Sequence, residues 1–488
     1  MTNVTGIVRA GVVALAAAGL AVGATRVGGS LQLAAAGGRA GLAETSSVPV
    51  DQASLVCPGQ QRLGASGLRD VKGTVTVAAA SPAPGVVAGA PATASGTVQL
   101  LGGPSSDGLG QTSERGAVVS AGSTAPASVL VRARGALAPG LVATQVWRHG
   151  GDDDRGLAVT PCQLPSSDAW LVGGGAGASR TERVIVTNPG ANAVSVSLEV
   201  LGRAGRIDAA SGRTVSVAPL SREVLSLDAV APDEPSPVVH VSATGGVVSA
   251  VLDEQWIDGA TGRGIDDATR AASPGTDLVV PGVETGGAVW LRLGNPGDTE
   301  ALARVRLLTG KGPVQPDDLR AVRVPAGGTV DVPVPRNASP MGLGIRSDHA
   351  LVAAAWTERR ATTADRMGDF AWTPATPALR GVAGVVLPGL QGSTKRLLLT
   401  AGSAPATVQV RLGSGDDARV STVPVAADST AVVDAGNADA VWVVPTTGTV
   451  RGAVSVAGVD GGVPFLSVAS LSEAPVRAQS VPVRQVRN

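Results

Sequence analysis

Tryptophan is the residue type whose positions in this sequence most suggest a ligand. Trp147, Trp256 and Trp356 each follow the closing hairpin of a repeated segment, and the fourth segment lacks the residue. An exposed indole could stack on a sugar ring, because it combines a large apolar face with a polar N–H group. Alternatively, each ring fills a core or a junction between modules that are otherwise rich in alanine and valine.

A polar loop after the first of these tryptophans carries three adjacent carboxylates, Asp152, Asp153 and Asp154. Carboxylate oxygens bind calcium, so these residues are candidates for ligand contact. Their spacing does not follow that of a calcium-binding loop, and three neighbouring side chains do not converge easily on one ion. Similar polar loops follow the later tryptophans, one of them leading into Asp266 and Asp267. We expect solvated hairpin loops and no metal site.

The chain has two cysteines, Cys57 and Cys162. An even number in an exported chain favours one disulfide, which would join the two ends of the first module. Closing a loop of roughly a hundred residues adds several kcal/mol of stability on the loop-entropy model. Two free thiols or a metal pair are the alternatives, although a zinc site needs more ligands than the neighbouring sequence offers.

The remaining polar residues form no recognisable catalytic set. His149, His240 and His349 lie in three separate modules, and no serine–histidine–aspartate or cysteine–histidine arrangement emerges. The glycine run at 173–177 is not followed by the lysine and helix of a phosphate-binding loop. Hydrolysis by paired carboxylates stays open, because the sequence does not show which acids converge. We expect no enzyme activity and no cofactor.

A repeated strand–turn–strand segment must position these residues. Asn188-Pro189-Gly190 separates two apolar strands, the same phrase returns at Asn295, and a weaker copy follows at 397–412. The two asparagines are 107 positions apart, a period that matches one small all-β domain. We expect Pro189 to fix φ and Gly190 to supply the permissive backbone for the reversal.

Short apolar strands closed by glycine mark the start of each repeat. Gly59, Gly174, Gly282 and Gly389 are separated by 115, 108 and 107 positions. Each opening is followed by the strand–turn–strand segment and ends in a hairpin with glycine or aspartate at its centre. The predicted domains are a signal or anchor helix with a flexible tether at 1–45, a divergent module 1 at 46–165, module 2 at 166–272, module 3 at 273–380 and module 4 at 381–488.

Alternation of apolar and polar residues predicts strands with one buried and one solvated face. About seven such strands fall in each module, with turns every 8–12 residues, which is the pattern of an antiparallel sandwich. We predict an all-β fold of tandem immunoglobulin-like antiparallel β-sandwich modules after an N-terminal hydrophobic helix. A barrel is less favoured, because the strand lengths are uneven.

The first residues have the features of a targeting segment. Arg9 precedes sixteen uncharged residues that end at Thr25, and Arg26 follows. A short basic start and an apolar core are typical of a signal peptide, although an uncleaved membrane anchor remains an alternative. In either case we expect the body of the protein outside the cytoplasm, either secreted or anchored to the membrane by this segment.

The charge balance argues against nucleic acid as a partner. The sequence has 39 lysine and arginine residues and 39 aspartate and glutamate residues, so its net charge is zero. A nucleic-acid-binding protein would normally carry a basic excess that displaces counterions from phosphate groups. No basic stretch with interleaved aromatic residues occurs either.

The leader, the Cys57-Pro-Gly opening, Cys162 before Trp170-Leu-Val-Gly-Gly, and the Asn-Pro-Gly repeats together resemble an actinobacterial exported protein family of unknown function. Members of that family carry an N-terminal hydrophobic segment and a body rich in alanine, valine and glycine. The resemblance covers nearly the whole chain and implies no catalytic residue. It implies a place in the cell envelope and a role around envelope polysaccharide.

The leading hypothesis is therefore a non-enzymatic, extracytoplasmic scaffold or spacer of the cell envelope, linked to polysaccharide assembly. An alternative is a carbohydrate-binding envelope protein that uses the tryptophans or the acidic loop. A second alternative is a glycoside hydrolase with two carboxylates in one cleft. Envelope proteins or glycans are the expected partners. Burial of the three tryptophans would favour the scaffold, and exposure would favour carbohydrate binding.

Overall fold

The computed structural model of the chain describes residues 46–60, 73–87, 95–103, 107–151, 154–175, 179–207, 214–337, 339–362 and 367–480. These residues form antiparallel β-strands and one 3-10 turn, η1 (Asp317–Leu319), so the predicted all-β class is confirmed. The helix predicted within residues 1–45 lies outside the described residues. Within these ranges, no helix has the length and apolar character that a membrane span requires.

The strands belong to two units, which are described separately. The smaller unit comprises Met1–Val48 and Arg477–Asn488, and its described strands are β1 (Ser46–Pro49) and β35 (Arg477–Ser480), which pair with each other. The larger unit, Pro49–Val476, contains the strands from β2 to β34.

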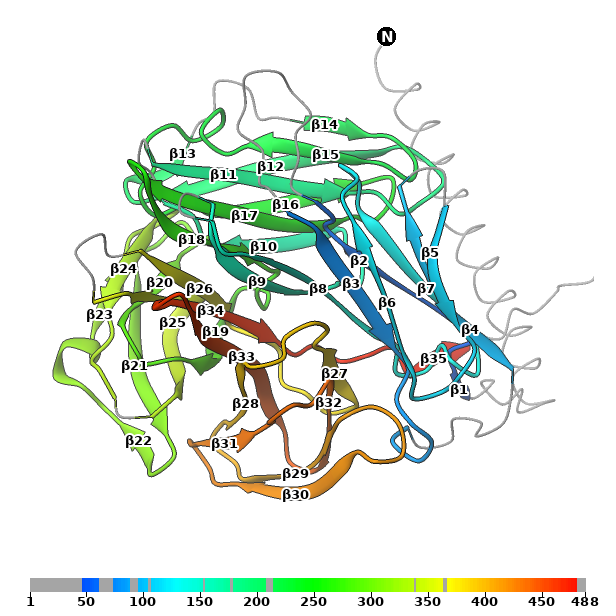
Figure 1. The fold of residues 1–488 in the computed structure, drawn as a ribbon. Coiled ribbons are helices and arrows are strands. Elements are labelled where there is room, and N and C mark those ends of the chain that lie inside the picture. Colours follow the sequence, from blue (N-terminus) through cyan, green and yellow to red (C-terminus); the bar gives the residue numbers. More distant parts are fainter. Residues whose placement is uncertain are drawn as a thin grey trace, which may run out of the picture. The chain divides into compact units, whose positions relative to one another are not determined.

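The first half of the larger unit contains the strands of modules 1 and 2. In Figure 1 they run from blue through cyan to green. Those of module 1 are β2 (Gln52–Cys57), β3 (Val75–Ala80), β4 (Gly96–Gly102), β5 (Asp107–Thr112), β6 (Val118–Ser123), β7 (Val129–Gly135), β8 (Val142–His149) and β9 (Gly156–Pro161). Those of module 2 are β10 (Asp168–Val172), β11 (Arg180–Thr187), β12 (Val194–Gly202), β13 (Gly205–Ile207), β14 (Thr214–Val217), β15 (Arg222–Ser226), β16 (Val238–Thr244), β17 (Ser249–Asp258) and β18 (Thr261–Ala268).

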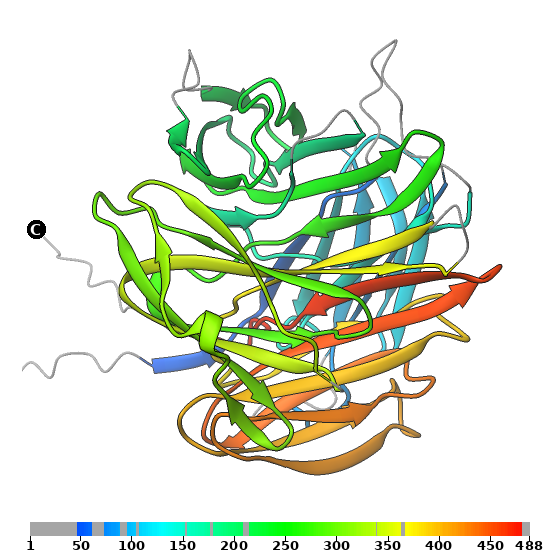
Figure 2. The same ribbon diagram turned by 90° about the vertical axis from the view of Figure 1, so that its left-hand side faces the viewer.

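The second half contains modules 3 and 4, drawn from light green to red in Figures 1 and 2. Module 3 has β19 (Gly275–Val283), β20 (Ala288–Gly294), β21 (Ala301–Thr309), β22 (Gly312–Val314), β23 (Val322–Val324), β24 (Thr329–Pro333), β25 (Met341–Arg360) and β26 (Gly368–Pro374). Module 4 has β27 (Ala383–Val386), β28 (Thr394–Ala401), β29 (Ala406–Leu412), β30 (Arg419–Val425), β31 (Thr430–Asp434), β32 (Ala440–Thr447), β33 (Val450–Asp460) and β34 (Val463–Ser470).

The strand order is the same in all four modules, including the divergent first one. One sheet has the order β2-β7-β4-β5 in module 1 and β27-β32-β29-β30 in module 4, and the other has β6-β3-β8-β9 and β31-β28-β33-β34. In module 3 the long strand β25 passes through both sheets, pairing with β19 and β21 first and with β20 and β26 afterwards. Each module therefore has eight strand positions, one more than the sequence pattern predicts, when β13 and β14 share a position, β22 and β23 share another, and β25 fills two.

The additional position is the last strand of each module. The sequence pattern did not predict it, because its polar residues were expected in a loop. Asp266 and Asp267, expected in a solvated loop, lie in β18 and are buried. Their carboxylates make hydrogen bonds to other modules: Thr160 donates to Asp267 at 2.5 Å, and the Trp372 amide donates to Asp266 at 2.7 Å. The prediction failed here because these acids are buried by neighbouring modules and not by their own sandwich.

The predicted turn at Asn188 is present, and hydrogen bonds of the asparagine side chain stabilise it. The buried Asn188 donates through Nδ2 to the carbonyls of Asn192, Val217 and Ala218, at 2.8, 3.0 and 3.1 Å. Its Oδ1 accepts the N–H of Gly190 at 2.9 Å. The expected role of Gly190 was wrong, because its φ lies outside the left-handed region that favours glycine. A Cβ at this position would instead lie 3.2 Å from Asn188 Oδ1, a tight contact that favours glycine.

The glycines that close the module openings do adopt the left-handed conformation. Gly59, Gly174, Gly282 and Gly389 have φ values of 78°, 82°, 72° and 65°. Glycine reaches this region without the steric cost that a side chain incurs, so the repeated residue marks a repeated backbone bend. The expected disulfide between Cys57 and Cys162 is also present.

The last strands of the four modules, β9, β18, β26 and β34, meet as a set that we call the central strands. β18 contacts β9 and β26, and β34 contacts β26 and β9, so the contacts close on themselves. Figures 1 and 2 both show the yellow β26 beside the red β34. The four modules of the larger unit are thus joined in a closed cycle.

Three of the central strands, β9, β18 and β26, contribute apolar side chains to the core of the preceding module in the cycle. Ile265 belongs to the core of module 1, and Phe370 belongs to that of module 2. Leu157 of module 1 packs into module 4, which closes the cycle, and Leu466 forms a smaller cluster with Ala371 of module 3. Burial of this apolar surface gives the modules a reason to associate, since such burial is the main favourable term in folding.

Candidate functional site

The three predicted tryptophans divide into one structural residue and two that approach solvent. Trp147 is 2% exposed and lies in the core of module 1, which matches the interpretation of a buried plug. Trp256 and Trp356 are only partly buried. They meet at the seam between modules 2 and 3, where their ring centroids are 6.2 Å apart.

Strand pairing in module 3 adds two tryptophans that the sequence interpretation did not select. Trp290 on β20 is the cross-strand partner of Trp356 on β25, which is in turn the partner of Trp372 on β26. The three side chains therefore form a row across three adjacent strands, in which neighbours on one face lie about 5 Å apart. Trp372 is buried, whereas Trp290 at the other end of the row is 38% exposed.

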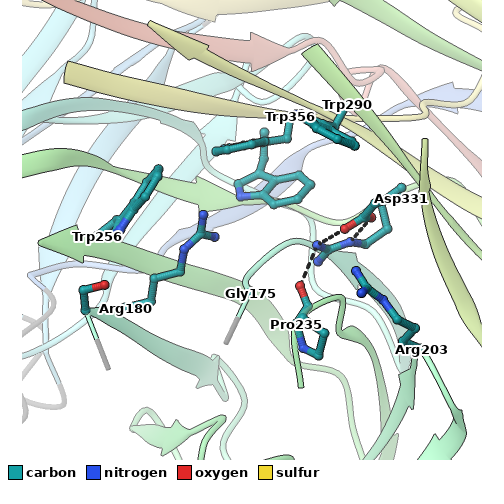
Figure 3. Close-up of a pocket in the computed structure, with 11 residues that line it drawn as sticks. Gly175, Arg180, Arg203, Pro235, Trp256, Trp290, Asp331 and Trp356 are labelled. Atoms are coloured by element: carbon teal, nitrogen blue, oxygen red, sulfur yellow. Dashed lines mark hydrogen bonds and ion pairs between the residues drawn. The ribbon is translucent and has the colours of Figure 1, made fainter. Parts of the chain in front are cut away.

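A cavity of about 430 Å³ opens over this row, and we call it the tryptophan pocket. Module 3 supplies Trp290, Arg292, Asp331, Trp356 and Trp372. Module 2 supplies the facing wall, and Figure 3 shows side chains from both modules directed into the space. The residues from module 2 are Gly175, Ser179, Arg180, Arg203, Pro235 and Trp256.

Arg180 orders one side of the pocket. Its guanidinium carbon lies 4.4 Å from the ring centre of Trp256 and 5.5 Å from that of Trp356. One of its nitrogens is 2.5 Å from Oε1 of the buried Glu254, whose other oxygen accepts Trp372 Nε1–H at 2.7 Å. Cation–π contact and a paired charge together hold the rings in place, so this wall of the pocket is preorganised.

Arg292 orders the opposite side. The buried guanidinium binds Asp331 through two hydrogen bonds of 2.8 and 2.9 Å. It also donates to main-chain carbonyls of module 2, including that of Pro235 at 3.2 Å. Burial opposes ionisation of Asp331, but the hydrogen bonds and charge of Arg292 outweigh it and lower the pKa of this carboxyl group.

Acidic side chains lie behind the module 2 wall. Glu182, Glu254 and Asp266 are cross-strand neighbours on β11, β17 and β18. Burial raises the pKa of Glu182 to about 8, and the charge of Glu254 adds to the shift. Burial also raises the pKa of Asp266. The Gly175 amide donates to Glu182 at 2.5 Å, so these acids support the backbone of the wall.

One polar group in the pocket is available for further hydrogen bonds. Nε1–H of Trp356 has no partner among the described residues, but it is buried. Arg203 is exposed and donates through one nitrogen to Ser236 at 3.3 Å, which leaves other N–H groups for a ligand. A site with an exposed indole face and an exposed guanidinium is suited to a ligand that has apolar faces and many acceptor oxygens.

The acidic loop and the histidines do not join this site. Asp152 and Asp153 lie outside the described residues, and the buried Asp154 has one carboxylate oxygen 3.1 Å from Nδ1 of His149. His240 binds Asp168 at 2.6 Å on the surface of module 2. In the described part of the chain, no three histidine, cysteine, aspartate or glutamate side chains are grouped to hold a metal ion.

Sequence inspection missed Trp290, Trp372 and the arginines for a physical reason. They lie on strands separated by loops and modules, and only the pairing register shows that they meet. The available signal was composition, because module 3 holds three of the seven tryptophans.

Comparison with known proteins places the chain in a family without assigning an activity. No curated protein matches the sequence. Among solved structures, the viral chemokine binding protein R17 encoded by rodent gammaherpesvirus Peru is similar at a TM-score of 0.17 and 10% identity, over 66% of this chain and 90% of that chain. A likeness at this level carries no functional argument. Residues 116–436 match the sequences described as Family of unknown function (DUF5719), and because this match covers more than half of the chain, the protein belongs to that family.

Proposed function

We propose that the protein is a non-enzymatic, extracytoplasmic scaffold that binds carbohydrate in the tryptophan pocket. The observation that carries the proposal is the row of Trp290, Trp356 and Trp372, with its exposed end opening into a cavity lined by arginines. An indole face packs well against the C–H face of a pyranose ring, and arginine N–H groups donate to hydroxyl or acidic oxygens.

The same pocket argues against glycoside hydrolysis, the second alternative from the sequence. Hydrolysis needs one carboxylic acid to donate a proton and a second carboxylate to activate water or attack the sugar. Among the described residues that line the pocket, Asp331 is the only one with a carboxyl group. The lowered pKa of Asp331 and its bond to Arg292 suit a structural anion, so binding without cleavage is the better-supported function.

The scaffold role is supported by the closed cycle of modules. A spacer extends a chain, whereas the contacts of β34 with β9 bring module 4 back to module 1. The disulfide and the leader-like first residues support a location outside the cytoplasm. We therefore favour a rigid platform in the cell envelope, which assists polysaccharide assembly by holding a glycan, with envelope proteins or glycans as partners.

The immunoglobulin-like classification of the modules is part of this proposal. In that fold, strands B and E pair in one sheet and strands C and F pair in the other. Strands β11 and β15, at the second and fifth strand positions of module 2, pair in this way, as do β12 and β16 at the third and sixth positions. The opening strand β10 differs, because it pairs with β16 instead of with the second strand.

Intrinsic tryptophan fluorescence and calorimetry with defined oligosaccharides test the function. Maltohexaose, cellohexaose, xylohexaose and an oligogalacturonate would serve as neutral and acidic probes. We expect saturable binding of at least one probe, weakened about tenfold by Trp290→Ala, which corresponds to 1.4 kcal/mol. Leu302→Ala is the matched control, since Leu302 is also exposed but lies on β21 away from the pocket.

The proposal fails if no probe binds, or if Trp290→Ala and Leu302→Ala bind equally well. Release of shorter sugars during incubation would contradict the non-enzymatic part. That outcome is detected separately, by chromatography of the probe after prolonged contact with the protein.

A further inference from the structure

A second cavity, of about 400 Å³, lies where the segments that follow the four central strands converge, and we call it the linker pocket. Its walls come from residues 161–164 after β9, 269–271 after β18, 376–380 after β26 and 470–475 after β34. All four modules therefore contribute to it. Binding sites form preferentially at such junctions between domains, and this volume lies within the range that holds a small organic molecule.

The linker pocket is apolar in its depth and polar at its rim. Leu55, Leu141, Leu379 and Leu471 line it and are buried. Residues at the rim reach solvent, among them Leu164, which is 38% exposed. Cys162 also lines the pocket, and its disulfide to Cys57 fastens this wall to module 1. A molecule with an apolar body would therefore enter with that body first.

The charge at the rim favours an anion. Arg270 and Arg380 line the pocket, and Glu473 is the acidic residue among the described lining. The carboxylate of Glu473 accepts the main-chain N–H groups of Arg380 and of Gly381, the latter at 2.9 Å, so its charge is already engaged. Asp168, which does not line the pocket, interacts electrostatically with Arg270. Its carboxylate is itself hydrogen-bonded to His240 at 2.6 Å. Arg380 is exposed, and its guanidinium has no ion-pair partner among the residues that the structure describes.

Three further polar groups of the wall lack partners. The hydroxyl oxygens of Thr376 and Ser470 belong to residues that are only 7% and 9% exposed, and neither has a hydrogen-bond partner among the described residues. Nε2 of Gln163 is also buried and has no hydrogen-bond partner among the described residues. These atoms are themselves buried, and a buried polar group without a partner costs about 1–3 kcal/mol.

We propose that the linker pocket binds a small amphiphilic anion, with an apolar body held among the leucines and a single carboxylate or phosphate group held by Arg380 and Arg270. The site is independent of the carbohydrate site, which is formed by modules 2 and 3 alone. Occupancy would stabilise the cycle of modules, because the ligand contacts the linker of each one and binds the folded state only.

Anilinonaphthalene sulfonate is a suitable probe, since it combines an apolar body with one anionic group and becomes fluorescent when bound. We expect saturable binding at one site of the full chain, with competition by decanoate and by decyl phosphate. The stronger competitor identifies the head group as carboxylate or phosphate. Decanol has a similar body without the charge, and equal competition by decanol would overturn the requirement for an anion.

Variants locate the probe. Arg380→Gln should weaken probe binding about tenfold, the usual effect of losing a charge-assisted hydrogen bond, whereas Arg380→Lys should retain most of the affinity. Leu164→Asp should also weaken it by placing a negative charge at the rim, with Leu164→Ala as its control. Unchanged affinity in Arg380→Gln and Leu164→Asp would overturn the proposal. A loss in Trp290→Ala would do the same, because the probe would then occupy the tryptophan pocket.

Discussion

Glu182 is the side chain whose ionisation most directly links the candidate site to folding. It lies beside Glu254 on the neighbouring strand, with Asp266 on the next, and like charges directly opposite each other in a sheet repel. Burial, followed by the charge of Glu254, raises its pKa to about 8, while one main-chain N–H group opposes the shift. The carboxyl group therefore holds a proton in the folded protein at pH values where the unfolded chain has lost it.

This difference predicts that stability falls as the pH rises. An unfolded glutamate has a pKa of about 4.3, so between about pH 4.3 and 8 the folded state holds one more proton at this site. The contribution is fully present below the lower value and is lost as the pH passes the higher one. We expect Glu182 to lower the free energy of unfolding by about 1.4 kcal/mol per pH unit in this window.

Denaturant unfolding measured from pH 5 to pH 9 checks this prediction. Glu182→Gln keeps an oxygen that accepts the Gly175 N–H but has no ionisable carboxyl group. Its free energy of unfolding should therefore fall less steeply with pH, by the slope that corresponds to about one bound proton. Glu300→Gln, at an exposed position, should have the slope of the unchanged protein. Equal slopes for all three proteins would show that Glu182 does not titrate in this range.

Among the turns and strands, the Asn188 turn shows what a sequence pattern does and does not contain. The Asn-Pro-Gly motif predicted the position of the turn, because these three residue types between alternating strands are typical of turns. It did not show that the side-chain amide of Asn188 would donate hydrogen bonds to three main-chain carbonyl groups, two of them at residues 217 and 218. Asn295 repeats the arrangement with Thr299 and Val324, so the conserved spacing within the chain reflects one hydrogen-bond pattern used twice.

Asn188→Ala should lower the free energy of unfolding by about 3 kcal/mol, because it removes several hydrogen bonds and leaves buried carbonyl groups without donors. Thermal and denaturant unfolding would measure the loss. Asn192→Ala is the matched control: Asn192 is exposed and contributes its carbonyl, not its side chain, to the turn. A loss of less than 0.5 kcal/mol, the range of ordinary surface substitutions, would contradict the assigned role.

The strands themselves were largely predictable, whereas their partners were not. Alternation and the repeat of about 107 residues indicate strands such as β11, β12, β20 and β21. The row of Trp290, Trp356 and Trp372 depends on register, which hydrophobic patterning fixes only after the sheet order is known. The candidate site therefore became visible only when the strands were paired.

Association of the four modules depends on contacts that no local pattern contains. Leu157 meets the core of module 4, more than two hundred residues away in the chain, and the acids of β18 are satisfied by modules 1, 3 and 4. A sequence that reads as a row of sandwiches is equally compatible with an extended or a closed arrangement. What favours closure is the apolar and acidic character of the central strands, which would be costly to expose or to leave unpaired.

Asp369 on β26 accepts hydrogen bonds from residues of all four modules. Its carboxylate accepts the main-chain N–H groups of Leu157 at 2.9 Å, Ile265 at 3.4 Å, Leu466 at 3.0 Å and Phe370 at 3.0 Å. Burial raises the pKa of Asp369, and these four donors oppose the shift. Both oxygens accept hydrogen bonds from the surrounding amides, and these contacts favour the ionised form against the effect of burial.

Asp369→Asn tests whether this carboxylate joins the modules. An amide group would turn N–H donors toward two of the four main-chain N–H groups, so the variant should lose about 3 kcal/mol of stability or more. Asp298→Asn, at a fully exposed site, should be neutral. Hydrogen exchange followed by mass spectrometry should then show faster exchange in peptides from β9, β18, β26 and β34 together. Faster exchange confined to β26 would mean that Asp369 stabilises only its own strand, and that the apolar contacts alone hold the cycle of modules closed.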